Sequence, residues 1–243
     1  LVILAYNLIM NNYIQDKNKL VNSVFTKVHK KYDVMNDIMS LGIHRLWKKK
    51  LIDWMNPQLD TKLIDVASGT GDLAKLFSEK NNNNNEIICV EPNKEMFETG
   101  KERLKSYQNI KWKIASAEKL PCKDNSFDFY TISYGIRNVN NINLCLKEAY
   151  RVLKPGGRFM CLEFSKVDNE LINFVYQNYS KVIPFVGKYI VGSSKPYDYL
   201  IKSINIFYNQ DELVNLMKKN GFTNVEYRNL SNGISAIHSG WKI

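Results

Sequence analysis

Short apolar runs alternate with longer amphipathic segments along the chain from residue 62 onward. In the longer segments the apolar residues recur every three or four positions, which predicts helices, whereas the short runs are bounded by turn residues and predict buried strands. The predicted strands are KLIDVAS, EIICVEPN, NIKWKIAS, FDFYTISYG and GRFMCLEFS, and the predicted helices are GDLAKLFSEK, KEMFETGKERLKSY and NINLCLKEAYRVLK, the last ending at Pro155-Gly156-Gly157. Strands that alternate with helices predict an α/β domain whose parallel sheet is covered on both faces.

The alternation breaks at residues 166–208, which are rich in Tyr, Phe, Ile and Val. We interpret this segment as a helical insert that caps the ends of the strands. Residues 211–220 predict a short helix that ends at Gly221, and VEYRNL and ISAIHSGWKI predict a closing β-hairpin. Residues 81–85, a run of asparagines between a predicted helix and a predicted strand, are expected to be a lengthened surface loop without function.

The composition is that of one globular domain with a basic surface. The chain has 243 residues, and its 34 Lys and Arg against 24 Asp and Glu give a net charge of +10, which favours contact with anionic partners. The lysines are scattered, so we interpret them as a solvated surface rather than a nucleic-acid site. The four cysteines form no CxxC pair, which indicates free thiols in a reducing compartment and no structural zinc. No apolar stretch approaches the roughly 20 residues of a transmembrane helix.

A glycine-rich turn with an acid on each side, DVASGTGD, occupies residues 65–72 between the first predicted strand and the first predicted helix. Gly69 and Gly71 fit the pattern GxGxx(G/A), and Glu91 follows 20 residues after Gly71, at the end of the second strand. Taken literally, this is the fingerprint of a dinucleotide-binding, NAD-dependent oxidoreductase. Asp65 argues against that hypothesis, because a pyrophosphate beside a buried carboxylate costs on the order of several kcal/mol.

A cationic cofactor removes this conflict. S-adenosylmethionine (SAM) carries an α-ammonium and a sulfonium and has no phosphate, so the acids and the glycine turn suit it. Glu91 is expected to accept hydrogen bonds from two ribose hydroxyls. The ends of the third and fourth strands should place Ser116 and Ala117 near the adenine and Ser133 near the methionine part. A tight turn without a ligand is the alternative, and Asp72 could serve only to begin a helix.

Four longer motifs resemble those of a known family. They read YDVMNDIMSLGIHRLW at residues 32–47, TISYGIRNV at 131–139, RVLKPGGRFMCLEFS at 151–165 and GISAIHSGWKI at 233–243. From about residue 25 to its end, the chain resembles the ubiquinone/menaquinone biosynthesis C-methyltransferases of the UbiE type. The resemblance implies an α/β, Rossmann-like class I SAM-dependent methyltransferase fold. That fold has a seven-stranded, mostly parallel sheet with an antiparallel last strand, N-terminal helices and a helical insert before the last helix.

The resemblance also implies which residues contact SAM. The family's cofactor contacts fall on Thr70, Glu91, Ser116, Ala117 and Ser133, beside Asp65, Gly69 and Gly71, which the chemistry of the turn selects. Three positions depart from the usual family residues, since Ser68 replaces Gly, Glu91 replaces Asp and Ser116 replaces Asn. These changes keep the required chemistry and could alter cofactor affinity. No metal is expected in the site.

We expect one methyltransferase domain over residues 25–243. Within it, residues 25–55 should form an N-terminal helical lid, and residues 166–208 the helical cap. Residues 1–24 are interpreted as a flexible segment or the remnant of a presequence.

Methyl transfer to a ring carbon requires that carbon to be nucleophilic, and it becomes so when the neighbouring hydroxyl loses its proton. The expected substrate is therefore a reduced quinol and not a quinone. Arg137 and Asn138 follow the fourth strand at the edge where ligands bind. We expect Arg137 to stabilise the phenolate or orient a water, and Asn138 to position the substrate. A structural ion pair between Arg137 and Glu163 is the alternative.

The resemblance implies a polyprenylated methoxy-benzoquinol substrate in ubiquinone biosynthesis. The Asn- and Lys-rich composition favours a mitochondrial enzyme, and a polyprenyl tail favours peripheral contact with the matrix side of the inner membrane. A homodimer or a quinone-biosynthesis complex is the expected assembly, without a nucleic-acid partner. The alternatives are a demethylmenaquinol methyltransferase, an RNA methyltransferase and a structural subunit of such a complex.

Overall fold

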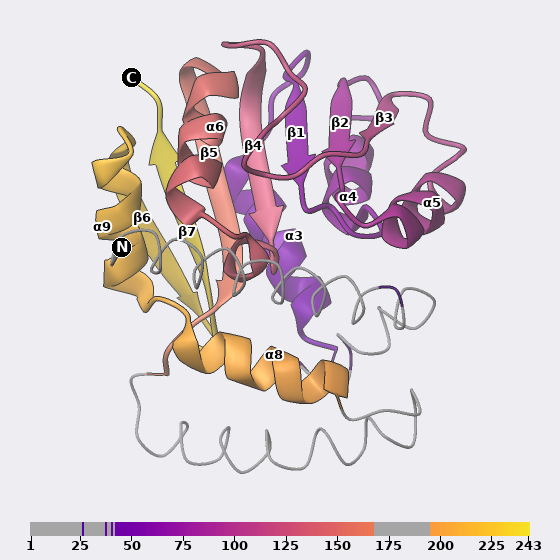
Figure 1. Ribbon diagram of the computed structural model, residues 1–243. Helices are drawn as coiled ribbons and strands as arrows, with labels where there is room; N and C mark the ends of the chain where they lie inside the picture. Colours follow the sequence, from indigo (N-terminus) through magenta and orange to yellow (C-terminus); the bar gives the residue numbers. More distant parts are fainter. Residues whose placement is uncertain (1–25, 27–36, 38–39, 41, 168–194) are drawn as a thin grey trace, which may run out of the picture.

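The computed structural model describes residues 26, 37, 40, 42–167 and 195–243, which form a seven-stranded sheet flanked by helices (Figure 1). The strands lie in the order β3-β2-β1-β4-β5-β7-β6. β1 to β5 pair in parallel, and β7 is antiparallel to both of its neighbours. The predicted seven-stranded sheet, mostly parallel with an antiparallel last strand, is therefore confirmed.

The predicted strands and helices correspond to described elements. The strands are β1 (Leu63–Val66), β2 (Ile87–Val90), β3 (Ile110–Lys113), β4 (Phe127–Ser133), β5 (Leu153–Phe164), β6 (Thr223–Leu230) and β7 (Ser235–Trp241). The helices are α3 (His44–Met55), α4 (Asp72–Lys80), α5 (Lys94–Arg103), the 3-10 helix η2 (Ile136–Asn138), α6 (Ile142–Val152), α8 (Lys195–Ile206) and α9 (Gln210–Lys219). None of the described helices has the length and apolar character needed to span a bilayer.

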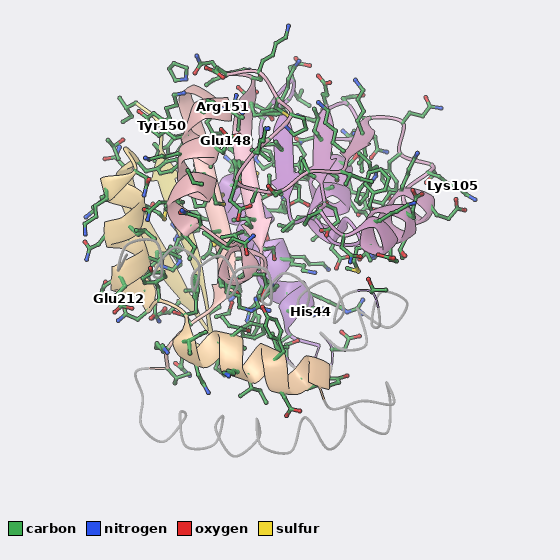
Figure 2. All side chains as sticks on the ribbon, viewed as in Figure 1. His44, Lys105, Glu148, Tyr150, Arg151 and Glu212 are labelled. Atoms are coloured by element: carbon green, nitrogen blue, oxygen red, sulfur yellow. The ribbon has the colours of Figure 1, made fainter. Side chains whose placement is uncertain are left out.

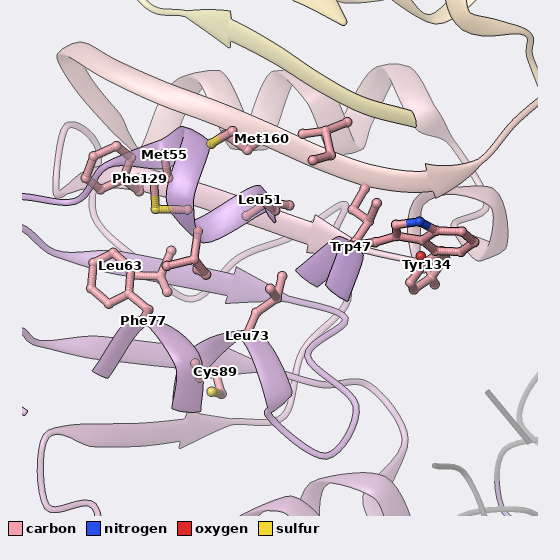
Figure 3. Close-up of a cluster of buried hydrophobic side chains, with 14 of the residues drawn as sticks. Trp47, Leu51, Met55, Leu63, Leu73, Phe77, Cys89, Phe129, Tyr134 and Met160 are labelled. Carbon is pink, nitrogen blue, oxygen red and sulfur yellow. The ribbon is translucent and has the colours of Figure 1, made fainter. Parts of the chain in front are cut away.

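Helices cover both faces of the sheet because the side chains of β1 alternate between two clusters. Leu63 packs with residues of α3 and α4 on one face, whereas Ile64 and Val66 pack with residues of α6 and α9 on the other. Figure 3 shows the first cluster, in which side chains of α3 and α4 lie against the strands. Asp65 shares a face with Leu63 and therefore points towards α3 and α4.

The strand order reverses between β1 and β4, and their carboxyl ends lie side by side at one edge of the sheet. Such a reversal is the usual ligand-binding point of an open α/β sheet. α8 lies beyond this edge (Figure 1), and the Tyr199 hydroxyl donates a hydrogen bond of 2.9 Å to the side-chain oxygen of Asn138. α8 is the described helix of the expected cap, and α3 is that of the expected lid. Residues 1–25 and 168–194 lie outside the described residues.

The Pro-Gly-Gly segment lies inside a strand, contrary to the expectation that it ends the preceding helix. α6 ends at Val152, and β5 begins at once with Leu153. Two hydrogen bonds to Lys242, which directly follows the last strand, hold the segment: Gly156 N–H donates to the Lys242 carbonyl at 2.7 Å, and Lys242 N–H donates to the Gly157 carbonyl at 2.9 Å. This pairing with a distant part of the chain makes the segment an irregular part of the sheet.

The asparagine run is anchored more firmly than a lengthened surface loop would be. Asn81 and Asn85 are buried, and the Asn85 amide donates to the Thr61 carbonyl at 2.7 Å and to the Gln58 carbonyl at 3.2 Å. Asn82 and Asn83 adopt positive φ angles of 53° and 63°, which asparagine tolerates better than most residues. The run therefore builds the turn between α4 and β2.

Candidate functional site

A cavity opens at the carboxyl ends of β1 and β4. Its lining residues come from both strand ends, from α3 and from the glycine-rich turn: Lys48, Asp65, Ala67, Ser68, Thr70, Asp72, Leu73, Ser133 and Tyr134. Ala67 and Tyr134 follow the two strands with φ angles of 51° and 55°. Residues other than glycine rarely adopt such angles, and where they do they often lie at functional sites. The predicted Asp65, Thr70 and Ser133 are thus brought together in one cavity.

The glycine-rich turn depends on its glycines. Gly69 and Gly71 have φ angles of 58° and 84°. A Cβ atom on Gly71 would lie 2.6 Å from the Leu104 side chain, so the residue is needed for close packing as well as for its backbone angle. These two constraints fix how the turn leaves β1 and enters α4.

Asp65 is a buried carboxylate with one hydrogen-bond donor. Only 2% of the residue is exposed, and the Thr131 hydroxyl donates to its Oδ1 at 2.7 Å. Burial raises the pKa of Asp65 to about 7, although the Thr131 hydroxyl and the positive charge of Lys48 oppose the rise. A cationic group beside Asp65 would therefore meet an acid that releases its proton readily near neutral pH.

Asp72 begins α4 and is neutralised by two cations. Lys48 Nζ lies 2.6 Å from one carboxylate oxygen, and Arg103 Nη1 lies 2.7 Å from the other. Burial alone would raise the pKa of Asp72, but Lys48 and Arg103 hold it at about 2. Arg103 also donates to the Thr70 hydroxyl at 2.9 Å. Asp72 thus organises the turn, a larger role than that of a helix-initiating residue.

Glu91 ties the glycine-rich turn to α5. Its Oε2 accepts a hydrogen bond from Gly69 N–H and its Oε1 accepts one from Asn93 N–H, each at 2.9 Å. The side chain of Asn93 in turn caps α5 by accepting from Met96 N–H at 3.0 Å. Burial raises the pKa of Glu91 to about 7, against the effect of the two amides. Ribose binding by Glu91 stays a prediction.

The expected adenine and methionine contacts lie on two different strand ends. Ser116 is exposed and Ala117 is buried, both after β3. The next residue, Glu118, accepts from Asn140 N–H at 2.7 Å and so ties this loop to the start of α6. At the end of β4, the Ser133 hydroxyl is buried at the cavity without a hydrogen-bond partner among the described residues.

Arg137 forms the ion pair with Glu163 that was the alternative to a catalytic role. The exposed fractions of the two side chains are 6% and 1%. Arg137 also donates to the Tyr134 carbonyl at 2.8 Å and to the Ser203 hydroxyl of α8 at 3.3 Å. Burial raises the pKa of Glu163 against the opposing charge of Arg137. The Arg137–Glu163 pair adjoins the cavity through Tyr134, so the ion pair and a role in catalysis are compatible.

His44, at the start of α3, is a structural residue. It begins α3 (Figure 2), and only 2% of it is exposed. Burial and the charge of Lys48 lower its pKa to about 4, so the ring is neutral at pH 7. Its Nε2 lies 3.5 Å from the Asp37 carboxylate. Within the described residues, no group of His, Cys, Asp and Glu side chains could hold a metal ion.

The sequence interpretation missed Lys48 and the α8 residues Tyr199 and Ser203. Lys48 directly follows the motif at residues 32–47, which was the available signal. Its pairing with Asp72 depends on how α3 packs against α4, and the sequence does not show that packing.

Comparisons with known proteins agree with this geometry. The model of the ubiE/COQ5 methyltransferase family matches residues 13–242. The ubiquinone/menaquinone biosynthesis C-methyltransferase UbiE of Rickettsia bellii is 50% identical over 235 residues, which cover 94% of each chain. The protein of that name from Rickettsia prowazekii is 49% identical over 234 residues, which cover 93% of this chain and 94% of the relative.

Solved structures support the fold. A SAM-dependent methyltransferase of Thermotoga maritima matches with a TM-score of 0.65 at 23% identity. The match covers 91% of this chain and 99% of that protein's chain. The CurJ carbon methyltransferase has a TM-score of 0.62 at 12% identity, over 84% of this chain and 55% of its own.

The cofactor is SAM, and the side chains that line the cavity suit its amino-acid part. Asp65 offers a carboxylate to the α-ammonium, and the unpartnered Ser133 hydroxyl offers a further hydrogen bond. Thr70 of the glycine-rich turn lines the same cavity, and its hydroxyl accepts a hydrogen bond from Arg103. The residues of this cavity would hold the amino-acid part of SAM.

Proposed function

The chain belongs to the ubiE/COQ5 methyltransferase family, and we propose that it transfers the methyl group of SAM to a ring carbon of a polyprenylated methoxy-benzoquinol in ubiquinone biosynthesis. It is a SAM-dependent C-methyltransferase. The identity of the acceptor is the proposed part. The names of the relatives, which refer to ubiquinone and menaquinone, support a quinol.

The observation that carries the proposal is a buried cation adjoining the cofactor cavity. Arg137 lies one 3-10 turn beyond Ser133 and Tyr134, which line that cavity, and Glu163 fixes its guanidinium. When bound, SAM supplies a methyl group on a positively charged sulfur, so a ring carbon can displace the sulfur once it is in line. The chain's own task is to hold the quinol and to stabilise the negative charge on its oxygen.

We assign that task to Arg137 and Asn138. The guanidinium of Arg137 would stabilise the phenolate that forms when the quinol hydroxyl loses its proton to water. Asn138, whose side-chain oxygen accepts from Tyr199 of α8, would position the ring through its amide group. Methylation forms a carbon–carbon bond and breaks the bond from sulfur to methyl, after which the ring carbon loses its proton to solvent.

The first experiment is methyl transfer from isotope-labelled SAM to short-tailed acceptors, with the product located by mass spectrometry. A methoxy-benzoquinol and a demethylmenaquinol are compared, each in reduced and oxidised form. We expect label on a ring carbon of the reduced methoxy-benzoquinol. Faster transfer to demethylmenaquinol would move the assignment to menaquinone synthesis, and transfer to oxidised acceptors would refute the phenolate mechanism.

Replacing Arg137 with alanine tests its assigned role. We expect turnover to fall by roughly 100- to 1,000-fold, the usual effect of removing a group that stabilises a developing oxyanion. The affinity for S-adenosylhomocysteine should change little. Arg151→Ala is the matched control, because Arg151 of α6 lies away from the cavity (Figure 2) and pairs with Glu148 and Asp124. If Arg137→Ala lowers cofactor affinity as much as turnover, the pair with Glu163 is structural.

Localisation and assembly remain proposals. A polyprenyl tail stays in a bilayer, so we expect the protein to bind peripherally to the matrix side of the mitochondrial inner membrane, with the +10 charge aiding contact with anionic lipid. The named relatives are bacterial and support quinol methylation without supporting that compartment. Flotation with anionic and neutral vesicles tests membrane binding. A protein that floats with neither kind of vesicle would refute it. Light scattering tests the expected homodimer.

A further inference from the structure

Lys48 is a buried lysine whose charge faces the cofactor cavity. The residue is 7% exposed, and it lines the cavity together with Asp65 and Asp72. An ammonium has three donors, and among the described residues only Asp72 accepts from Lys48, at 2.6 Å. Burying a lysine is costly unless partners compensate its charge, which suggests that Lys48 has a role beyond packing α3.

The pairing with Asp72 does not account for the whole charge of Lys48. Asp72 already has Arg103 at 2.7 Å on its other oxygen, so two cations serve one carboxylate. Lys48 Nζ thus shares its one described acceptor with a second cation, and it keeps further donors beside the cavity. An additional anion at Lys48 Nζ would accept from these donors.

The amino-acid part of SAM has the matching pair of charges. Its α-ammonium and α-carboxylate are attached to the same carbon, so a binding site must present an anion and a cation close together. The cavity does so with Asp65 from β1 and Lys48 from α3. We propose that Lys48 Nζ binds the α-carboxylate of SAM while Asp65 binds the α-ammonium, so that α3 is part of the cofactor site. The inference rests on SAM as the cofactor and is independent of the quinol acceptor.

The test compares two ligands on the full chain by titration calorimetry. S-adenosylhomocysteine carries the α-carboxylate, and its decarboxylated analogue, the aminopropyl thioether of adenosine, keeps the ammonium and lacks the carboxylate. For Lys48→Met, we expect affinity for S-adenosylhomocysteine to fall roughly 10- to 100-fold, as for loss of a charged hydrogen bond. Affinity for the decarboxylated analogue should change by less than about threefold, because no contact with it is lost.

Two further variants separate direct contact from structural support. Lys48→Gln keeps a donor for Asp72 and removes the charge, so it should show the same selective loss even if Lys48→Met folds poorly. Arg103→Met removes the other cation of Asp72 and should affect both ligands alike. If both Lys48 variants weaken the two ligands equally, or weaken neither, Lys48 does not bind the carboxylate and the proposal is wrong.

Discussion

Replacing Asp65 with asparagine should stabilise the cofactor-free protein above pH 7 while weakening its binding of SAM. Asp65 is 2% exposed, and burial raises its pKa from an ordinary value of 3.8 to about 7. Asparagine is close in shape and keeps an oxygen that can accept from the Thr131 hydroxyl, now at 2.7 Å from Asp65. The substitution therefore removes an ionisable group with little change in packing.

The size of the effect follows from the two pKa values. Between pH 4 and pH 7, Asp65 is ionised in the unfolded chain and protonated in the folded one, so stability falls as the pH rises through this window. Above pH 7 both states are ionised and the loss is complete. At about 1.4 kcal/mol per pKa unit, the loss reaches about 4 kcal/mol. Asparagine has no such loss, so the variant should gain up to about 4 kcal/mol over the wild type at pH 8.

Urea denaturation of both proteins at pH 5, 6, 7 and 8 measures this difference. The gap in the free energy of unfolding should be smallest at pH 5 and should widen towards pH 7. Glu91, whose pKa is also about 7, is present in both proteins. A gap that does not change with pH, or an asparagine variant that is less stable at pH 8, would refute the reasoning. Calorimetry at pH 8 should show S-adenosylhomocysteine bound roughly 10-fold or more weakly by the variant.

Two substitutions test the packing of the fold, each against an exposed neighbour. Gly100→Ala should lower the free energy of unfolding, measured with urea, by about 1–3 kcal/mol, because the new Cβ would lie 2.2 Å from the Trp112 ring. Glu98→Ala, at an exposed position of the same helix, should change it little. Asn85→Ala should lower the free energy of unfolding by about 1–3 kcal/mol, because it removes the donor to the Thr61 and Gln58 carbonyls. Asn84 is exposed, so Asn84→Ala should change this free energy by no more than about 0.5 kcal/mol. Equal losses within either pair would contradict the packing described above.

The central sheet could be predicted from the sequence because its strands are short apolar runs between turn residues. Their carboxyl ends share one edge, so the pattern also placed Asp65 and Ser133 near each other. The same logic put Arg137 beside that edge. These predictions needed only the order of the elements along the chain.

Contacts between distant segments could not be predicted in this way. Lys48 joins the cavity because α3 packs on α4, and the sequence gives no spacing that reveals this. The hydrogen bonds that Lys242 makes with Gly156 and Gly157 place the Pro-Gly-Gly segment in the sheet, although its local pattern predicts only a helix end. Asn85 is buried for the same kind of reason, since its partners precede it by more than 20 residues.

The choice between a dinucleotide and SAM depends on where the carboxylates point, which the glycine pattern alone does not state. In a phosphate-binding turn, backbone N–H groups are directed at the phosphate oxygens. Here Glu91 accepts the Gly69 N–H at 2.9 Å, so that donor is already used by a carboxylate. Asp65 adds a second acid, and its charge has no direct cationic partner among the described residues. A pyrophosphate would have to displace the first acid and approach the second, whereas the ammonium of SAM gains from Asp65 and leaves Glu91 in place.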